Sequence, residues 1–275
     1  MIAREKLLIV NADDFGFTRG VNDGIVESHV NGILTAATLM ANGPEFEHAA
    51  ALARQHPSLD IGCHLVLVGG ASLLPPHRPY PLDLKGLLRA LWRKEFRIEA
   101  ELEAQVQRII HAGIRPTHLD THKHTHLLPP VLDVVARLSR KYSIPWVRRP
   151  FDFPITGPHA PLGRRLLSRS LDFMRRRFQR ALSAQGCRTT DHFAGFSVTG
   201  LFHTAELTSL LRQIPCGVTE FMTHPGFCNE ELRRAPTRLK ESRARELEAL
   251  CAPETREALT QFGIRLVNYR DLQSR

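Results

Sequence analysis

The sequence predicts an α/β fold: a (β/α) barrel of seven or eight parallel strands, closed or distorted and nearly closed. Short apolar runs alternate with amphipathic segments along the chain, which is typical of strand–helix units around a mainly parallel sheet. Carboxylates and imidazoles repeatedly follow the expected strands, as they do at the carboxyl-end face of such barrels. A length of 275 residues suits one barrel domain, and a doubly wound open sheet is the alternative.

The expected elements follow in alternating order. The apolar run 7–11 has the composition of a strand buried on both faces, and Pro44 suits the first turn of the helix that follows it. Strands are expected at 7–11, 35–40, 60–67, 117–120, 145–148, 217–223 and 264–267. Helices are expected at 21–30, 45–55, 99–112, 131–141, 162–183, 205–213, 237–250 and 253–262.

Two proline-rich stretches, 69–96 and 149–161, interrupt this alternation, and each contains four prolines. We expect both to be inserted loops or lids. The chain has no internal repeat and no long Gly/Ser linker, so residues 1–275 are predicted to form a single domain with these two insertions.

Composition excludes several classes of protein. No apolar run approaches the roughly 20 residues of a membrane-spanning helix, and the N-terminus does not resemble a signal peptide. The five cysteines include no Cys-x-x-Cys pair, which disfavours a disulfide framework and a cysteine zinc site. We therefore expect a cytoplasmic protein.

The net charge is +9, and much of it lies in the expected helix 162–183. Apolar residues with helical spacing alternate there with seven arginines. One interpretation is an outer helix packed on the barrel, and the other is a basic amphipathic helix at an anionic membrane surface. The second interpretation predicts a peripheral location at the inner face of the membrane. Nucleic acid is not an expected partner, because three tyrosines and two tryptophans offer few stacking positions.

The residues that follow the first strand are Asp13 and Asp14. Adjacent residues at a strand end point in different directions, so one carboxylate can bind a metal while the other faces substrate. Metal-assisted hydrolysis needs this division, with one ligand and one base for the attacking water. A simple turn would also favour aspartate, but histidines follow later strands.

Those histidines form the sharpest pattern in the sequence. His64 lies in the third expected strand, and His122, His124 and His126 follow the fourth. In an extended segment all three share one face, and in a helical turn His122 and His126 do, so either geometry offers two imidazoles to one cation.

Three further residues complete the candidate site. Asp120 precedes the histidines and could orient an imidazole, and Arg148 follows the fifth expected strand, where it could contact substrate. His224 ends a late strand and could act as a general acid that protonates a leaving group.

Together these motifs resemble those of the YdjC-like (ChbG-type) carbohydrate deacetylases. The resemblance rests on LIVNADDFG at 8–16, NGILTAAT at 31–38, IGCHL at 61–65, THLDTHKHTH at 117–126 and THP at 223–225. Within this family, HLVLVGG at 64–70, DTHKH at 120–124 and TTDHF at 189–193 resemble the hopanoid-biosynthesis-associated branch known as HpnK.

The resemblance implies a hydrolase that removes an N-acetyl group from an amino sugar with one divalent metal ion. Position by position, it implies that Asp14, His64 and His122 hold the metal, that Asp13 is the general base and that His224 is the general acid. The branch implies a lipid-linked substrate, an N-acetylglucosaminyl hopanoid, whereas the family's soluble substrates are chitooligosaccharides. Zn²⁺ suits two imidazoles, and Mg²⁺ is often assigned in this family.

One position departs from the family pattern, because Lys123 stands where many members carry another histidine. This leaves open whether His124 or His126 also binds the metal. The expected partners are a lipid-linked amino sugar, an anionic membrane surface and a second copy of the chain in a homodimer. The alternatives are a deacetylase of soluble chitooligosaccharides and, in another class, a membrane-surface binding protein with an inactive site.

Overall fold

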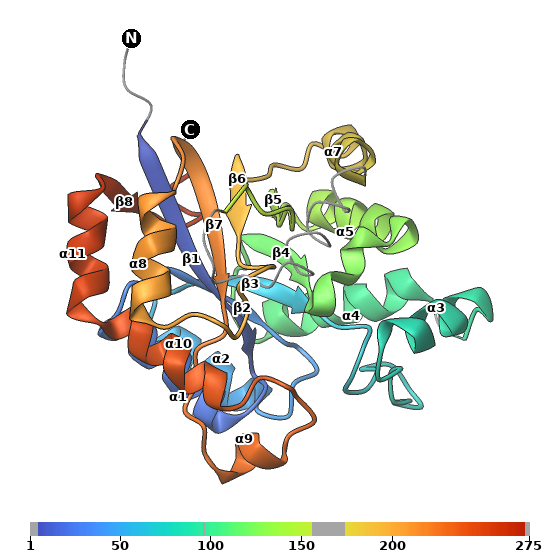
Figure 1. Ribbon diagram of the computed structural model, residues 1–275. Helices are drawn as coiled ribbons and strands as arrows, with labels where there is room; N and C mark the ends of the chain where they lie inside the picture. Colours follow the sequence, from blue (N-terminus) through green and yellow to red (C-terminus); the bar gives the residue numbers. More distant parts are fainter. Residues whose placement is uncertain (1–4, 96, 156–173, 273–275) are drawn as a thin grey trace.

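The computed structural model describes residues 5–95, 97–155 and 174–272, and its centre is one parallel sheet curled into a barrel (Figure 1). Neighbouring strands follow the order β5-β4-β3-β2-β1-β7-β6, and β8 pairs with the start of β1. The strands are β1 (Lys6–Phe15), β2 (Ala36–Leu39), β3 (Asp60–Leu65), β4 (His118–Thr121), β5 (Trp146–Val147), β6 (His192–Ala194), β7 (Gly217–Thr223) and β8 (Ile264–Leu266).

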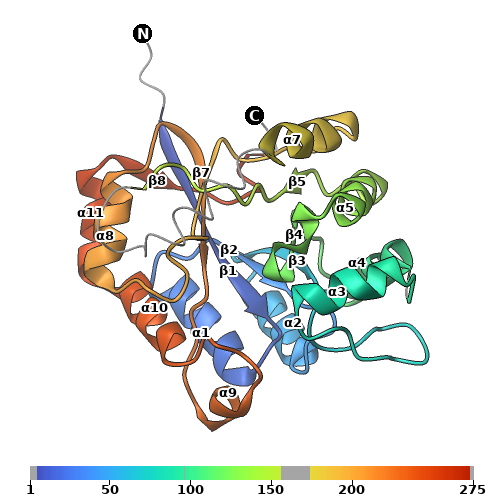
Figure 2. The ribbon, with the colours of Figure 1, turned by 45° about the vertical axis from the view of Figure 1, so that its right-hand side comes forward.

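The helices surround this sheet (Figure 2). They are α1 (Arg19–Val30), α2 (Phe46–Gln55), α3 (Leu84–Trp92), α4 (Ile98–His111), the 3-10 segment η1 (His122–Leu127), α5 (Pro129–Lys141), α7 (Arg175–Ala184), α8 (Thr204–Arg212), α9 (Glu230–Arg234), α10 (Glu241–Cys251) and α11 (Pro253–Gln261). The hydroxyl of Thr18 caps α1 by accepting a bond from the amide of Val21 at 3.2 Å.

The strand order confirms the predicted barrel. Strands β1 to β5 neighbour each other in chain order, and β6 and β7 continue from the other side of β1, so the order is cyclic and has no switch point. Two isolated parallel bridges, Trp146 with Arg188 and Asp152 with Phe193, bring the edges at β5 and β6 together. The doubly wound sheet that served as the alternative is therefore wrong, and seven strands form the nearly closed ring.

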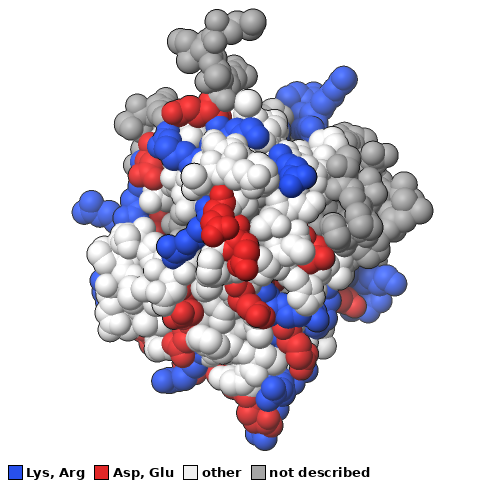
Figure 3. Space-filling model, turned by 60° about the vertical axis from the view of Figure 1, so that its left-hand side comes forward, with Lys and Arg blue, Asp and Glu red and all other residues white. Residues whose placement is uncertain are grey.

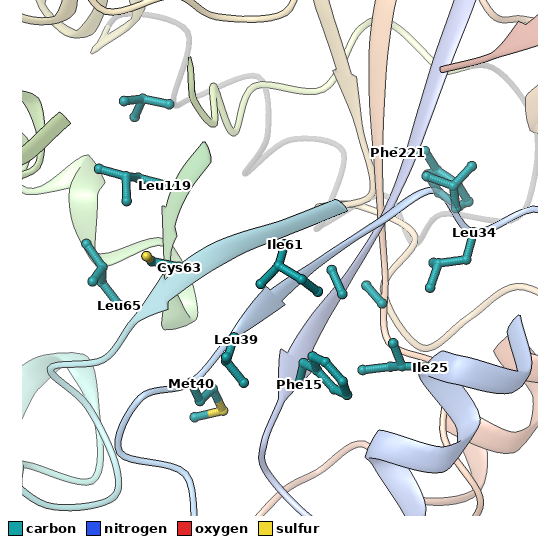
Figure 4. Close-up of a cluster of buried hydrophobic side chains, with 14 of the residues drawn as sticks. Phe15, Ile25, Leu34, Leu39, Met40, Ile61, Cys63, Leu65, Leu119 and Phe221 are labelled. Carbon is teal, nitrogen blue, oxygen red and sulfur yellow. The ribbon is translucent and has the colours of Figure 1, made fainter. Parts of the chain in front are cut away.

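The core explains why these runs became strands. Every residue of β1 from Leu7 to Phe15 is buried, as expected for a strand covered on both faces. Figure 4 shows Phe15 of β1 beside Ile25 of α1, with Leu39 of β2 and Cys63 of β3 in the same buried cluster. This packing fixes the strand ends relative to one another.

Several elements differ from the sequence-based expectations. Strand β1 continues to Phe15 instead of ending at residue 11, while the short strand β6 and the helix α9 were not predicted. The helix expected at 237–250 begins only at Glu241. Of the basic helix expected at 162–183, residues 162–173 lie outside the described residues and α7 covers the remainder. The expected insertion 149–161 is described only to residue 155, without regular helix.

The insertion 69–96 is more ordered than a loop. It contains α3, and its buried Tyr80 donates a hydrogen bond of 2.6 Å to Glu101 on α4. Ser72 donates to the same carboxylate at 2.6 Å, and Gln105 bonds both the N–H and the C=O of Val66 at 2.8 Å. The bonds of Tyr80 and Ser72 fasten the insertion to α4, and those of Gln105 fasten the segment just before it.

The surface charge is mixed where α8, α10 and α11 face the viewer. Figure 3 shows acidic and basic side chains interspersed over this side of the molecule. The net charge of +9 therefore forms no uniformly basic face there. Among the described residues, no helix is long and apolar enough to cross a bilayer.

Candidate metal centre and active site

Asp14 stands at a break in the regular geometry of β1. Its φ of 66° lies in the left-handed region, and the pairing of β1 with β2 shifts register between Ala12 and Phe15. Aspartate tolerates this backbone better than most residues. The irregularity lets Asp13 and Asp14 reach different partners at the same end of the barrel.

Three side chains converge beside this break. Oδ1 of Asp14 lies 3.4 Å from Nε2 of His64 and 3.1 Å from Nδ1 of His122, and the two histidine nitrogens are 3.2 Å apart. Ligand atoms bound to one cation at about 2.1 Å are separated by roughly 3.0–3.4 Å in octahedral or tetrahedral geometry. The three atoms thus have the spacing of a shared metal site, and the chain brings them from β1, β3 and η1.

The surroundings of these atoms fit a metal as well. Oδ1 of Asp14 is buried without a hydrogen-bond partner, while its Oδ2 accepts a bond from Arg243. Nδ1 of His64 lies 2.7 Å from Oδ1 of Asp120. A proton shared there leaves the Nε2 lone pair of His64 for the cation, the usual arrangement of a metal-binding histidine.

The balance of buried charges also favours a bound cation. Four buried carboxylates gather at this end of the barrel, from Asp13, Asp14, Asp120 and Glu220. Two buried guanidinium groups, of Arg148 and Arg243, face them. Buried carboxylates outnumber buried guanidinium groups at this end of the barrel, and because uncompensated buried charge is costly, the excess of negative charge favours a bound cation. Burial lowers the pKa of His64, but Asp120 and Asp13 outweigh it and raise this pKa to about 10, so the position attracts positive charge.

Asp13 belongs to a different cluster, centred on Arg148. The guanidinium of Arg148 donates two bonds of 2.7 Å to the carboxylate of Asp13 and also pairs with Asp120 at 2.5 Å and Glu220 at 2.6 Å. Burial raises the pKa of Asp13, but Arg148 and His64 outweigh it and hold this pKa far below its usual range. Asp13 is therefore ionised and fixed in orientation. Its oxygens are already bonded to a cation, unlike Oδ1 of Asp14.

His224 follows β7 and faces Asp13 across the site. Its Nε2 lies 4.0 Å from Oδ2 of Asp13, and its Nδ1 is buried with no hydrogen-bond partner. Burial lowers the pKa of His224 to about 4, so the resting imidazole is neutral at pH 7. Its backbone N–H donates to Glu246 at 2.6 Å, which ties the position to α10.

The other two histidines of the cluster lie elsewhere. Nδ1 of His126 is 2.6 Å from the hydroxyl of Thr121, and its Nε2 is 3.2 Å from the carbonyl of Arg148. His124 sits against aromatic rings, with its ring centre 5.5 Å from that of Phe196. Among the described residues, neither histidine belongs to a group close enough to share a cation. Lys123 and His124 have left-handed backbones, which turn His122 alone toward Asp14.

Sequence reasoning missed four residues of the site. Glu220 carried a usable signal, because a charged residue within an otherwise largely apolar strand needs a buried partner. Thr38 lies 3.2–3.4 Å from Asp13, His64 and Asp120, yet a threonine in a strand is unremarkable in sequence. Arg243 and Glu246 come from α10, where no pattern separates them from surface charges.

Known proteins resemble this chain along most of its length. The family model described as YdjC-like protein matches residues 7–261. A carbohydrate deacetylase of Brevibacillus brevis is 35% identical over 270 residues, which cover 96% of this chain and 99% of the relative. A chitooligosaccharide deacetylase of Serratia marcescens is 32% identical over 280 residues, covering 98% and 100%.

Solved structures show the same fold. A crystal structure from Enterococcus faecalis, of a protein named for cellobiose-phosphate cleavage, superposes with a TM-score of 0.78 at 27% identity and covers 98% of this chain and 99% of that one. The match of the family model over most of the chain, together with relatives above 30% identity along their whole length, shows that this chain belongs to the YdjC-like family.

Proposed function

We propose that this protein is a metal-dependent N-deacetylase that removes acetate from an N-acetylglucosamine-type sugar. The observation that carries the proposal is the pairing of two carboxylates with separate roles. Oδ1 of Asp14 faces His64 and His122 without a hydrogen-bond partner, while Asp13 lies next to it, ionised and bonded to Arg148. Relatives named as carbohydrate and chitooligosaccharide deacetylases support the same reaction.

The residues divide the work of amide hydrolysis. Asp14, His64 and His122 would hold the divalent cation, which when bound polarises an acetyl carbonyl and acidifies water. Arg148 holds the carboxylate of Asp13 by two bonds, so that this base is oriented before substrate arrives. Asp13 accepts the proton of the attacking water.

The departing amine needs a proton, and the imidazole of His224 faces Asp13 across the site. Because the pKa of His224 is lowered to about 4, the imidazole is neutral at rest and must gain its proton during the cycle. The 4.0 Å between His224 Nε2 and Asp13 Oδ2 places it near the group that has just taken a proton from water. The proton can thus pass from water to Asp13, then to His224 and finally to the amine.

For the substrate we propose an N-acetylglucosaminyl hopanoid, deacetylated to the glucosaminyl form. The support is the HLVLVGG, DTHKH and TTDHF motifs, which resemble the hopanoid-associated branch. The alternative is a soluble chitooligosaccharide, which the relative from Serratia marcescens favours by its name. Both substrates carry the same N-acetyl group, so the site chemistry does not separate them.

One experiment decides between these substrates. Acetate release is measured with metal-stripped protein and after restoring Zn²⁺ or Mg²⁺, with an N-acetylglucosaminyl hopanoid and diacetylchitobiose side by side. Metal-dependent release from the lipid-linked sugar alone supports the hopanoid proposal, and release from chitobiose alone replaces it with the soluble substrate. Release that is equal in stripped and restored protein contradicts metal dependence. No release from either substrate overturns the proposed reaction.

A further inference from the structure

Helix α3 presents a row of apolar side chains to solvent. Seven large apolar side chains are exposed in the described part of the chain, and four of them lie within residues 82–92. Leu84, Leu88 and Trp92 are spaced four residues apart and share one face of the helix, and Leu82 precedes them. Trp92 is 82% exposed and Leu82 is 81% exposed. Grouped apolar exposure of this kind marks a surface for interaction.

This exposure does not reflect a poorly formed helix. The carboxylate of Asp83 caps α3 by accepting a bond of 2.7 Å from the amide of Gly86. On the opposite side, Leu87 and Ala90 are buried against the body of the protein. The insertion is fastened to α4 through Tyr80, and α3 lies beside α4 at the edge of the molecule (Figure 2). The apolar row is therefore held outward by an ordered helix.

Basic residues flank the apolar row. Lys85, Arg89 and Arg93 are also spaced four apart, about 100° further around the helix, and all three are exposed. Lys94 and Arg97 follow, so residues 82–97 carry five basic side chains against only Asp83 and Glu95. Apolar residues that include a tryptophan, lying beside a basic row, are typical of a helix in the plane of a membrane surface.

The same surface adjoins the mouth of the candidate site. Lys123 donates a hydrogen bond of 3.1 Å to the carbonyl of Leu82. Lys123 directly follows His122, whose side chain is 25% exposed, whereas those of Asp14 and His64 are 7% and 1% exposed. His122 is thus the most exposed member of the candidate metal centre. The side chain of Lys123, the next residue, connects this position to Leu82 at the start of the apolar row.

We propose that α3 docks on an anionic lipid bilayer, with Leu84, Leu88 and Trp92 in the interface and the basic row against the lipid headgroups. Charge complementarity selects this occupant, because the exposed basic row of Lys85, Arg89 and Arg93 borders the apolar row. The docked orientation brings the mouth of the site near the bilayer. The proposal concerns binding alone and stands apart from the identity of the sugar substrate. It assigns the membrane contact to α3, whereas the sequence pointed to residues 162–183.

The chain contains a built-in probe for this contact. It has two tryptophans, Trp92, which is exposed, and Trp146, which is 5% exposed. The full-length protein is mixed with vesicles of phosphatidylglycerol and phosphatidylcholine in equal parts, or of phosphatidylcholine alone. We expect co-sedimentation with the anionic vesicles only, a blue shift of tryptophan emission on binding, and quenching by brominated lipid. Binding should weaken as salt rises.

Matched variants locate the contact. Leu88→Ser with Trp92→Ser should weaken vesicle binding by about ten-fold or more, and Lys85→Glu with Arg89→Glu by about 25-fold or more. The apolar control is Val30→Ser with Ile110→Ser, which changes exposed residues on α1 and α4. The charge control is Arg176→Glu with Arg180→Glu on α7, which changes the same number of charges. Neither control should alter binding by as much as its α3 counterpart.

Three kinds of result would overturn the proposal. One is a wild-type protein that does not bind anionic vesicles. Another is binding without a change in the emission of Trp92, or binding that Arg176→Glu with Arg180→Glu weakens more than either pair of substitutions on α3 does. The third is a lipid-free dimer, by analytical ultracentrifugation, that Leu88→Ser with Trp92→Ser converts to a monomer, since a second copy of the chain would then be the occupant of this face. The circular dichroism spectrum and the gel-filtration volume serve as separate readouts and should be equal in all α3 variants, so the outcome does not depend on which sugar the protein deacetylates.

Discussion

The mouth of the barrel and the outer face of α3 depart in opposite directions from the usual distribution of side chains. At the mouth, charged groups such as Asp13, Asp14 and Arg148 are buried, whereas on α3 Leu88 and Trp92 are exposed. Most of the buried charges pair with opposite charges of the same chain. The exposed apolar row faces solvent and is not part of the described hydrophobic core. Buried charge therefore points to chemistry performed inside the fold, while exposed apolar surface points to a contact outside it.

The two regions also differ in what substitution should cost. A buried ion that loses its partner destabilises a protein by several kcal/mol, because no water replaces the lost bond. An exposed side chain already contacts water, so its replacement changes the folded and unfolded states almost equally. Variants at the mouth should thus affect activity or folding strongly, and variants of the exposed apolar row on α3 should affect neither.

The largest effect is expected at the metal-site residues. Asp14→Asn or His64→Ala removes one of the three proposed ligands, and the turnover number should fall by at least about 10⁴-fold while the fold survives. After loading with Zn²⁺ and gel filtration, the zinc content of both variants should fall below that of the wild type. Circular dichroism provides the control for folding. Full turnover or full metal retention in either variant would contradict the ligand assignment.

The next effect is expected from Arg148→Met, which leaves Asp13, Asp120 and Glu220 without their shared cation. The free energy of unfolding should fall by about 3–5 kcal/mol at pH 7, measured by urea denaturation. The loss should shrink toward pH 4, because the unpaired carboxylates can then take protons. The matched control is Arg137→Met, whose exposed ion pair with Glu99 should contribute less than about 1 kcal/mol. Equal losses in the two variants would show that the buried cluster contributes no more than a surface pair.

Some of these features can be predicted from the sequence and others cannot. Apolar periodicity predicted the strands and the barrel, because strands buried on both faces leave a local signature. His64, His122 and the two aspartates could be found because they lie at or just after the carboxyl ends of strands, and these strand ends share one face of a barrel. Arg243 could not be found, because its contact with Asp14 spans 229 residues and depends on where α10 packs. The exposed row on α3 was hidden as well, since a proline-rich stretch suggested only a loop.

Asp13→Asn tests whether the proposed base can be removed without loss of the proposed metal site. We expect turnover to fall by about 10²–10³-fold while zinc content stays near the wild-type value, because Asp13 is bonded to Arg148 and not to the atoms of the Asp14 group. Equilibrium dialysis with zinc measures the second quantity. A variant that loses the metal along with the activity would place Asp13 among the ligands, with His64 and Asp120 as the neighbours that could complete such a group.

The link between α10 and His224 can be tested through the pH dependence of stability in the Glu246→Gln variant. Burial raises the pKa of Glu246 to about 7, against the lowering effect of bonds from the amides of His224 and Gly200. The folded state therefore binds this proton more tightly than the unfolded state does, and the wild type loses about 3 kcal/mol of stability from this group as pH rises from about 4.5 to 7. Glu246→Gln does not titrate, so its stability relative to wild type should rise by that amount over the same range.

The measurement is the free energy of unfolding of both proteins at several pH values. Exposed Glu248 lies on the same helix, and Glu248→Gln is the control for a general change in net charge. A difference between wild type and Glu246→Gln that stays constant with pH would show that the carboxyl group does not titrate in this range. A small loss of turnover is expected as well, since His224 would lose part of its backbone anchor.

The smallest effect is expected on α3. Leu88→Ser with Trp92→Ser should change the free energy of unfolding by no more than about 0.5 kcal/mol, because both side chains are exposed and their loss opens no cavity. The control is Leu87→Ser in the same helix, whose fully buried side chain should cost about 2–5 kcal/mol. Urea denaturation measures both. A large loss in the exposed pair would mean that the apolar row already packs within this protein, and α3 would then have no free face to offer a bilayer.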